Sequence, residues 1–221
     1  RKILLRLTEL IRTKKEEIIR IKEILERLDY LNAKTVYSLN KKCTVPKVIN
    51  KEYLKLVEAR HPLIDENTVV PINFELGNSE NIMLITGPNT GGKTVTLKVA
   101  GLLTLMALSG IPVPANEKTE IGHFGSVLAD IGDEQSIEQN LSSFSGHVKK
   151  IKEIMEEANS SSLVLMDELG SGTDPMEGAA FAMAIIDYLN GKNIKSIITT
   201  HYSEVKAYAF NTTGIKSASM E

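Results

Sequence analysis

The sequence predicts an α/β fold, in which a mostly parallel sheet is flanked by helices and preceded by a long helix. Three observations lead to this prediction. Residues 1–32 contain no Gly or Pro and carry helical periodicity. After residue 80, short apolar runs alternate with helical patterns, which is typical of a parallel sheet covered on both faces. Finally, a Gly-rich loop joins one apolar run to the helical pattern that follows it.

The composition is that of an ordinary globular protein. The 221 residues are 42% hydrophobic and 24% charged, with a net charge of −2, so they suffice for one sizeable core and an appendage. A single cysteine, Cys43, excludes an internal disulfide and a Cys-cluster metal site, and fits a reducing, cytoplasmic compartment. The near-neutral charge argues against strong nucleic-acid binding by this segment alone. No run of about 18 apolar residues occurs, so no membrane contact is expected.

The first helix carries a broad apolar stripe. Its apolar residues are spaced by alternating steps of three and four, at Leu4, Leu7, Ile11, Ile18, Ile21, Leu25 and Leu28. Only Lys14 interrupts this seam, and further apolar residues widen it. The segment is thus one arm of a coiled coil or, the interpretation we favour, a long helix that packs on a neighbouring domain. Because the helical pattern is already present at the first residues, we interpret the chain as part of a longer protein.

The remaining elements follow in order. We expect a helix and its connection over 1–40 and a second domain over 41–221, whose first forty residues read as short strands and turns. The predicted strands cover 81–87, 111–115, 126–132, 162–168 and 194–200, with another beginning near 214. The predicted helices cover 94–108, 143–158, 175–189 and 203–210. No internal repeat is present.

The helix at 175 has the clearest boundaries. Asp174 is suited to cap it, Pro175 suits its first position, and Glu177 completes a capping box. Asn190 and Gly191 are expected to end it.

The Gly-rich loop has the pattern of a phosphate-binding loop. It matches G-x-x-x-x-G-K-[ST] at every fixed position, with the residues Gly87, Pro88, Asn89, Thr90, Gly91, Gly92, Lys93 and Thr94. Glycines let successive backbone N–H groups point inward, and the following helix adds its positive end. We expect Lys93 to reach the β- and γ-phosphates of ATP, and the Thr94 hydroxyl to bind Mg²⁺. A Gly-rich turn with a surface lysine is the alternative, which the strand before the loop and the helix after it disfavour.

Two further strand ends carry candidate catalytic groups. Asp167 and Glu168 follow four apolar residues, so they would lie at the carboxyl end of a buried strand, where α/β sheets bind ligands. Asp167 is suited to hold Mg²⁺, and Glu168 to orient or deprotonate the attacking water. An acidic turn that caps a helix is the alternative, and the phosphate loop earlier in the chain favours function. His201 ends another strand, where it could bind the γ-phosphate or water, although taken alone a structural histidine is the better interpretation.

Four longer segments resemble the ATPase domain of the MutS family. They read "TGPNTGGKT", "DIGDEQSIEQNLSSFSGH", "LMDELGSGTDP" and "TTHYSEVKAYA", and "ARHPLI" at 59–64 extends the resemblance to about residues 28–221. "GTDP" and "FSGH" are most similar to the MutS-II branch, whose full-length members end in a Smr nuclease domain. No "L-D-L-H-G" signature of that domain is present, so nuclease activity is not assigned to this chain.

The resemblance implies an ABC-type P-loop ATPase that works as a head-to-tail homodimer. Each ATP would lie between the phosphate loop of one subunit and a signature segment of the other, here Ser142, Ser143, Phe144, Ser145 and Gly146. The serines would also cap the helix over 143–158, and this capping chemistry is what makes an anion site at its positive end.

The resemblance also implies roles for single residues. Gln135 takes the position of a sensor of Mg²⁺ or of the γ-phosphate, although Asp130, Asp133 and Glu134 are nearby alternatives. Residues Gly172, Thr173 and Asp174 match the loop that crosses the dimer interface, and Asn89 matches an asparagine beside the γ-phosphate. His201 matches the switch histidine, which reverses the interpretation above. Where relatives stack an aromatic ring on adenine, this sequence has Val69 and Val70, so we expect apolar and weak recognition of the base.

Three functions are consistent with these residues. The first is the ATPase core of a MutS-II protein, in which ATP closes a dimer and a lever helix transmits the closure to a nucleic-acid clamp outside this chain. Such a protein would act in DNA repair and suppression of recombination, or on stalled ribosomes and their rRNA. The second is the ATPase domain of a mismatch-repair MutS. The third is an ATP-gated scaffold with negligible hydrolysis.

Overall fold

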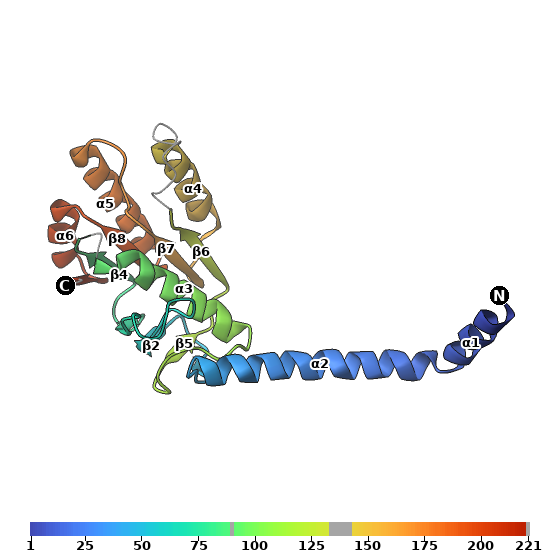
Figure 1. Ribbon diagram of the computed structural model, residues 1–221. Coiled ribbons are helices and arrows are strands. Elements are labelled where there is room, and N and C mark those ends of the chain that lie inside the picture. Colours follow the sequence, from blue (N-terminus) through green and yellow to red (C-terminus); the bar gives the residue numbers. More distant parts are fainter. Residues whose placement is uncertain (89–90, 133–142, 220–221) are drawn as a thin grey trace. The chain divides into compact units, whose positions relative to one another are not determined.

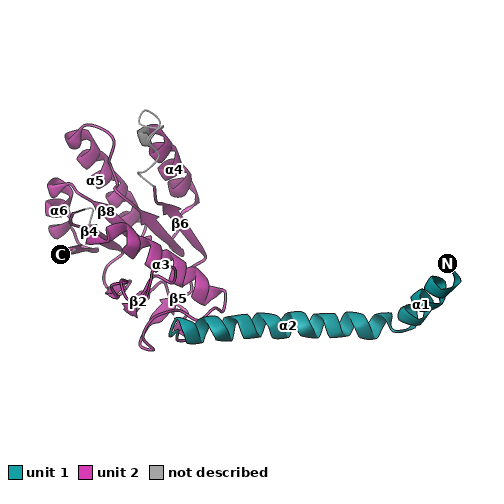
Figure 2. Cartoon of the chain, viewed as in Figure 1, with its two compact units in different colours: residues 1–43 teal, residues 44–221 magenta. Residues whose placement is uncertain are grey.

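The computed structural model describes residues 1–88, 91–132 and 143–219 (Figure 1). The chain divides into two compact units, Arg1–Cys43 and Thr44–Glu221 (Figure 2). Within the described ranges, no helix combines the length and the apolar character that a membrane crossing requires.

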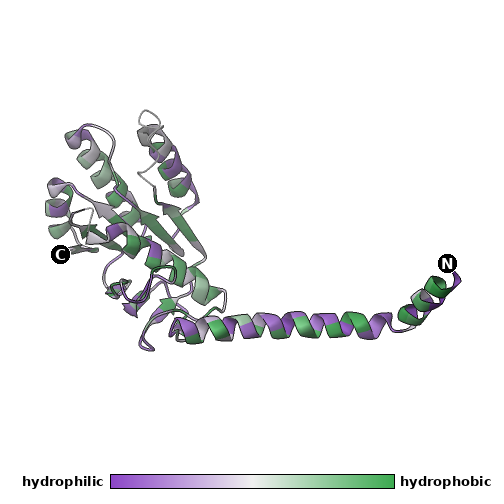
Figure 3. Cartoon of the chain, in the orientation of Figure 1, coloured by the Kyte–Doolittle hydropathy of each residue, from purple (hydrophilic) through white to green (hydrophobic). Residues whose placement is uncertain are grey.

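The first unit consists of two helices, α1 (Lys2–Thr13) and α2 (Lys15–Asn40). One continuous helix was therefore the wrong expectation. The break falls at Lys14, the residue that interrupts the apolar seam, where the backbone has φ −107° and ψ 11°. The Lys14 ammonium pairs with Glu17 at 2.8 Å, so this side chain serves the first turn of α2 rather than an apolar face. Neither helix buries a side chain within the described residues, and apolar and polar residues alternate along both (Figure 3).

The second unit is built on a five-stranded parallel sheet. Its order is β6-β7-β8-β4-β9, with β4 at Ile82–Thr86, β6 at Ser126–Asp130, β7 at Ser162–Met166, β8 at Lys195–Thr200 and β9 at Ile215–Ser219. Every pairing in it is parallel. The three central strands β7, β8 and β4 are buried along nearly their whole length, which is expected when helices cover both faces. The predicted parallel α/β fold is confirmed.

The faces of this sheet are covered by different helices. Alternate residues of the central strands point to opposite faces. Met83, Leu165 and Ile197 pack with α3 (Lys93–Leu108) in one core cluster. Leu84 and Ile198 belong to the other cluster, with α4 (Ser143–Glu157), α5 (Pro175–Gly191) and α6 (Ser203–Phe210) (Figure 1). The sheet is therefore held rigidly between two apolar layers, which fixes the positions of the loops at its ends.

A second, mixed sheet packs into the cluster beside α3. Its order is β1-β5-β2-β3, with β1 at Lys47–Ile49, β2 at Leu54–Ala59, β3 at Ile72–Leu76 and β5 at Glu120–Gly122. The strand predicted over 111–115 was wrong, since only Val113 forms a bridge, to Thr44. Pro112 and Pro114 lack the N–H groups that a strand ladder needs. The three-residue strand β5 was missed because it is too short to show a period.

Helix α5 begins as its sequence predicts. The Asp174 carboxylate accepts hydrogen bonds from the N–H groups of Met176 (2.9 Å) and Glu177 (3.4 Å), and Pro175 occupies the first turn. The left-handed residue after the helix is Asn193, with φ 56°, rather than Gly191. Asn and Gly are the residues that adopt this conformation most easily.

The start of α5 packs directly on the turn that follows β7. A Cβ atom added at Gly178 would lie 2.4 Å from the carbonyl oxygen of Gly170 and 2.6 Å from the Tyr202 hydroxyl. That hydroxyl donates a hydrogen bond of 2.9 Å to the same carbonyl. Only glycine therefore fits at position 178.

Gly178→Ala is expected to lower the free energy of unfolding by about 1–3 kcal/mol, because a rigid backbone oxygen blocks the added methyl group. Gly191→Ala, in the same helix, is the matched control, since its Cβ would meet nothing within 4 Å. That change is expected to be neutral or to stabilise the protein by up to about 1 kcal/mol. Chemical denaturation of both variants measures the difference, and equal stabilities would contradict the close packing.

Candidate functional site

The candidate site lies at the carboxyl edge of the five-stranded sheet. Strand β8 pairs with both β4 and β7, with Thr200 opposite Thr86 and Ile198 opposite Met166. The residues that follow these three strands therefore emerge at the same edge. They are the phosphate loop after β4, the two acids after β7 and His201 after β8. The fold brings together three segments that are far apart in the sequence.

The described part of the loop after β4 has the backbone of a tight turn. Gly87 and Gly92 have φ values of 136° and 83°, which residues with a Cβ atom rarely adopt. The N–H of Gly91 donates to the carbonyl of Pro88 at 3.1 Å. Helix α3 then begins at Lys93, so the positive end of a buried helix faces the turn. Asn89 and Thr90 lie outside the described residues.

Lys93 is buried although it carries a charge. Its side chain is only 2% exposed, and its Nζ donates a hydrogen bond of 2.5 Å to the carbonyl of Gly87, the first residue of the loop. The ammonium group thus lies over the loop rather than in water. Burying a charge is costly unless it is paired, so a lysine held here by the loop is well placed to receive an anionic ligand. Thr94 follows in the first turn of α3 and is half-buried.

The two acids after β7 are held by one threonine of the neighbouring strand. Asp167 is 7% exposed, and its Oδ1 accepts a hydrogen bond of 2.5 Å from the Thr199 hydroxyl. Its backbone N–H donates to the carbonyl of Asp130 at 2.9 Å. Glu168 has φ 49°, and its N–H donates to the Thr199 hydroxyl at 2.8 Å. Thr199 was not among the site residues predicted from the sequence, because its contact with the acids depends on the pairing of β7 with β8.

His201 is exposed at the end of β8, between the strands that carry the loop and the acids. Its ring centroid lies 4.2 Å from that of Tyr202, with a tilt of 40°. Tyr202 is buried and bonded to Gly170, and burial, followed by the charge of Asp174, raises the pKa of its hydroxyl. The exposed histidine therefore lies against a buried aromatic neighbour.

The signature segment is described only in part. Helix α4 begins at Ser143, as predicted, and Ser143 and Phe144 form its first turn. Ser145 and Gly146 are exposed, and a Cβ atom added at Gly146 would meet nothing within 4 Å. Ser142, like Gln135, Asp133 and Glu134, lies outside the described residues. Ser145 and Gly146 of this first turn are therefore accessible from outside the unit.

Asp130 links this helix to the sheet. Its Oδ2 lies 2.9 Å from Nδ1 of His147, in the second turn of α4. As noted above, its carbonyl accepts the N–H of Asp167. The carboxylate of Asp130, an alternative to Gln135 in the sequence analysis, is thus engaged with His147.

The expected interface loop also has a structural role. Gly172 is exposed with φ 87°, and the Thr173 hydroxyl donates to Glu177 Oε2 at 3.2 Å. The Asp174 carboxylate caps α5, as described above. The loop is therefore held in one shape by the helix that follows it.

The residues expected near the base lie in the loop between β2 and β3. Val69 is half-buried and its N–H donates to the carbonyl of Asp65 at 2.9 Å, whereas Val70 is 77% exposed. At the start of this loop, burial and then the charge of Lys98 lower the pKa of His61. Because Lys98 belongs to the second turn of α3, that start of the loop lies within electrostatic reach of the helix behind the phosphate loop.

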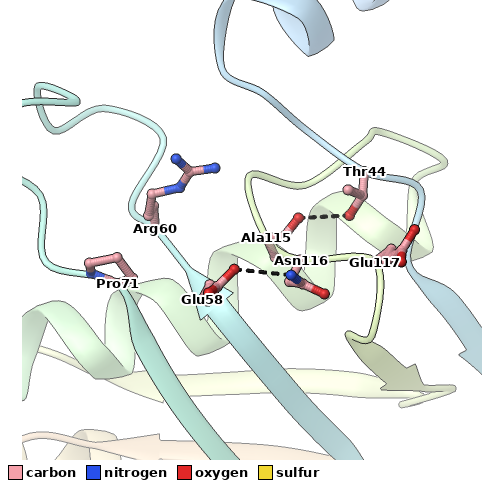
Figure 4. Close-up of a pocket in the computed structure, with 7 residues that line it drawn as sticks. All are labelled: Thr44, Glu58, Arg60, Pro71, Ala115, Asn116 and Glu117. Carbon is pink, nitrogen blue, oxygen red and sulfur yellow. Dashed lines mark hydrogen bonds between the residues drawn. The ribbon is translucent and has the colours of Figure 1, made fainter.

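A cavity of about 400 Å³ lies elsewhere in this unit (Figure 4). Two of its lining side chains make hydrogen bonds to the loop after α3. The Thr44 hydroxyl donates to the carbonyl of Ala115 at 2.9 Å, and Glu58 Oε2 accepts from Asn116 Nδ2 at 3.0 Å. These bonds hold the loop against Thr44 and β2, so we interpret the cavity as a structural junction of the small sheet.

The donor set fits Mg²⁺ bound together with a nucleotide. Across the described ranges, no three His, Cys, Asp or Glu side chains gather to form a metal site of their own. Mg²⁺ is typically held by one or two carboxylates, a hydroxyl, substrate phosphates and waters. Asp167, after β7, and Thr94, in the first turn of α3, would supply the protein part of such a set at this edge of the sheet.

Comparisons with known proteins agree with the resemblance. Residues 83–221 match the family model described as MutS domain V. The chain is 64% identical over 221 residues to the Endonuclease MutS2 of Fusobacterium nucleatum, and 51% identical over 220 residues to that of Caldanaerobacter subterraneus. Both matches cover 100% of this chain and 28% of the relative, so the chain spans little more than a quarter of their length. A third, from Clostridium botulinum strain Langeland, is 54% identical over 198 residues, 90% of this chain and 25% of that protein.

Proposed function

The chain belongs to the MutS family, and on this premise we propose that it binds ATP with Mg²⁺ and hydrolyses the ATP to ADP and phosphate. The observation that carries the proposal is the buried Lys93, held over a glycine loop at the positive end of α3. A helix N-terminus with inward-facing N–H groups favours phosphate. The site is at the sheet edge where α/β folds bind ligands.

Each residue of the site has a proposed role in the binding or hydrolysis of ATP. The loop from Gly87 to Thr94 and the Lys93 ammonium bind the phosphates, with Asn89 beside the γ-phosphate. Asp167 and Thr94 would hold Mg²⁺, with Gln135 as its sensor, and the bound cation would supply positive charge beside the phosphoryl group that is transferred. Glu168 orients and deprotonates the attacking water. His201, exposed at the end of β8, contacts the γ-phosphate or that water, and Val69 packs against the base.

The proposal extends to a homodimer of ATPase domains. The exposed residues Ser145 and Gly146, in the first turn of α4, support a site for the γ-phosphate of a partner's ATP. The loop Gly172–Asp174 would cross the same interface. Its fixed shape, set by the cap of α5, suits a contact that must form repeatedly.

For the whole protein, we propose a cytoplasmic MutS2-type clamp on nucleic acid. The three relatives described above are each named Endonuclease MutS2, which favours this branch over mismatch-repair MutS. Helices α1 and α2, with their exposed apolar residues, would form the lever that transmits closure. Contacts to DNA, in repair and suppression of recombination, or to rRNA of stalled ribosomes, would be made by parts outside this chain.

Mg·ATP is expected to double the mass of the chain in light scattering, because each ATP needs the signature segment of a second copy. Ser145→Arg, in the first turn of α4, should abolish the shift by placing a bulky cation at the interface. Glu153→Arg is the matched control, since it adds an arginine at an exposed position further along the same helix. An unchanged mass of the parent chain in the presence of Mg·ATP would contradict the trans site.

A further inference from the structure

We propose that Thr199 is the positioning residue for both acids of the site, an inference that rests on the proposed ATP hydrolysis. Thr199 is fully buried in β8, next to β7. Nothing in its sequence motif assigns it a role, since the resemblance places the switch function on His201. The structure shows it in contact with three consecutive residues after β7.

The contacts of Thr199 converge on the turn after β7. Its hydroxyl donates to Asp167 Oδ1 at 2.5 Å and accepts from the N–H of Glu168 at 2.8 Å. Its carbonyl accepts from the N–H of Leu169 at 3.0 Å. One residue thus fixes the side chain of the metal-binding acid and the backbone of the catalytic acid.

The hydroxyl has a single proton, and this sets the direction of the network. A threonine hydroxyl donates one hydrogen bond and accepts up to two. Because an N–H can only donate, the Glu168 N–H must bond to a lone pair of the Thr199 hydroxyl oxygen. The hydroxyl proton of Thr199 is then donated to the Asp167 carboxylate. With Oδ1 held, the carboxylate cannot rotate about its last side-chain torsion, and Oδ2 keeps one position relative to the sheet. A fixed oxygen is what a cation with strict octahedral geometry requires.

The backbone of Glu168 explains the second contact. A φ of 49° is uncommon for a residue with a side chain, and such conformations persist only where the surroundings enforce them. The hydrogen bond from the Glu168 N–H to the Thr199 hydroxyl is one such constraint. The hydrogen bond from the Leu169 N–H to the Thr199 carbonyl is a second. Together they set the direction in which the Glu168 side chain leaves the turn. Removal of the hydroxyl should therefore loosen both acids at once.

The test separates the hydroxyl from the volume of the residue. Thr199→Val keeps the branched shape and removes the hydroxyl, whereas Thr199→Ser keeps the hydroxyl and removes a methyl group. Ser196→Ala is the matched control, because Ser196 is a fully buried hydroxyl on the same strand that bonds to Ile194, before the strand begins. If Thr199→Val does not fold, as judged by thermal unfolding, Thr199→Ala replaces it.

Two measurements are made on each variant of the full chain. One is the affinity for a fluorescent ATP analogue in EDTA and over a titration with Mg²⁺; the other is steady-state phosphate release. For Thr199→Val, the half-saturating Mg²⁺ concentration should rise, and kcat fall, by about 10- to 100-fold, as for other residues that orient metal ligands. Binding in EDTA should match the parent, because Lys93 and the loop are intact. Thr199→Ser should recover most of both properties, and Ser196→Ala should resemble the parent.

The outcomes distinguish this inference from the proposed function. Parent-like Mg²⁺ dependence and kcat in Thr199→Val would overturn the role of Thr199. Equal damage in Thr199→Ser and Thr199→Val would also overturn it, because the loss would then follow volume rather than the hydroxyl. If the parent chain itself neither binds nor hydrolyses ATP, the proposed function fails. If Glu168→Gln loses hydrolysis while Thr199→Val keeps it, only the inference about Thr199 fails.

Discussion

Lys93→Ala should lose ATP binding, with a fall in affinity of about 30-fold or more. Removing one partner of a buried, hydrogen-bonded charge pair typically costs about 2–5 kcal/mol, and each 1.4 kcal/mol is a factor of ten. The buried position of the ammonium strengthens its attraction to phosphate, since little water screens it. Isothermal titration with ATP and Mg²⁺ measures the change.

Two further variants make this result specific. Lys93→Met retains most of the side-chain volume in the buried position, so a loss of affinity shared with Lys93→Ala reports the charge rather than a cavity. Lys118→Ala removes an exposed charge from the loop after α3 and should leave the affinity unchanged. Tight binding of ATP by Lys93→Met would refute the phosphate site, and with it the proposed function.

The sequence could predict the elements whose signals are local. The cap at Asp174, the glycine loop before α3 and the apolar strand before Asp167 are each encoded within about ten residues, and the structure has all three. The parallel sheet followed because helices separate its successive strands. The prediction of a strand over 111–115 was wrong although its apolar pattern is present. Its two prolines lack the N–H groups that the hydrogen-bond ladder of a sheet requires.

The remaining features depend on contacts between distant residues. Thr199 is hydrogen-bonded to Asp167, which lies 32 residues earlier in the sequence, after the neighbouring strand. His147, in α4, is hydrogen-bonded to Asp130, at the end of β6. Neither contact has a local pattern, so the strand pairing had to be known first. The break at Lys14 was present in the sequence as the one gap in the apolar seam, but a charged residue in a helix is common and does not by itself predict an interruption.

Glu168→Gln should lower phosphate release by about 100-fold or more while ATP binding is retained, because general-base catalysis typically contributes about 10²- to 10⁴-fold. Glutamine has nearly the same shape, so the turn held by Thr199 is preserved, but a neutral amide cannot take a proton from water. Single-turnover phosphate release, with ATP affinity measured in parallel, gives both quantities. Glu153→Gln, on an exposed glutamate further along α4, is the matched control and should release phosphate like the parent.

This variant also decides between an enzyme and an ATP-gated scaffold. If the parent chain turns over ATP and Glu168→Gln does not, the acid after β7 performs chemistry, and its constrained backbone is part of the catalytic geometry. If both bind ATP and neither releases phosphate, the same loop and acids act as a switch that senses nucleotide. In that case the contact from Thr199 would serve to hold Mg²⁺ alone, because positioning of Glu168 would have no reaction to support.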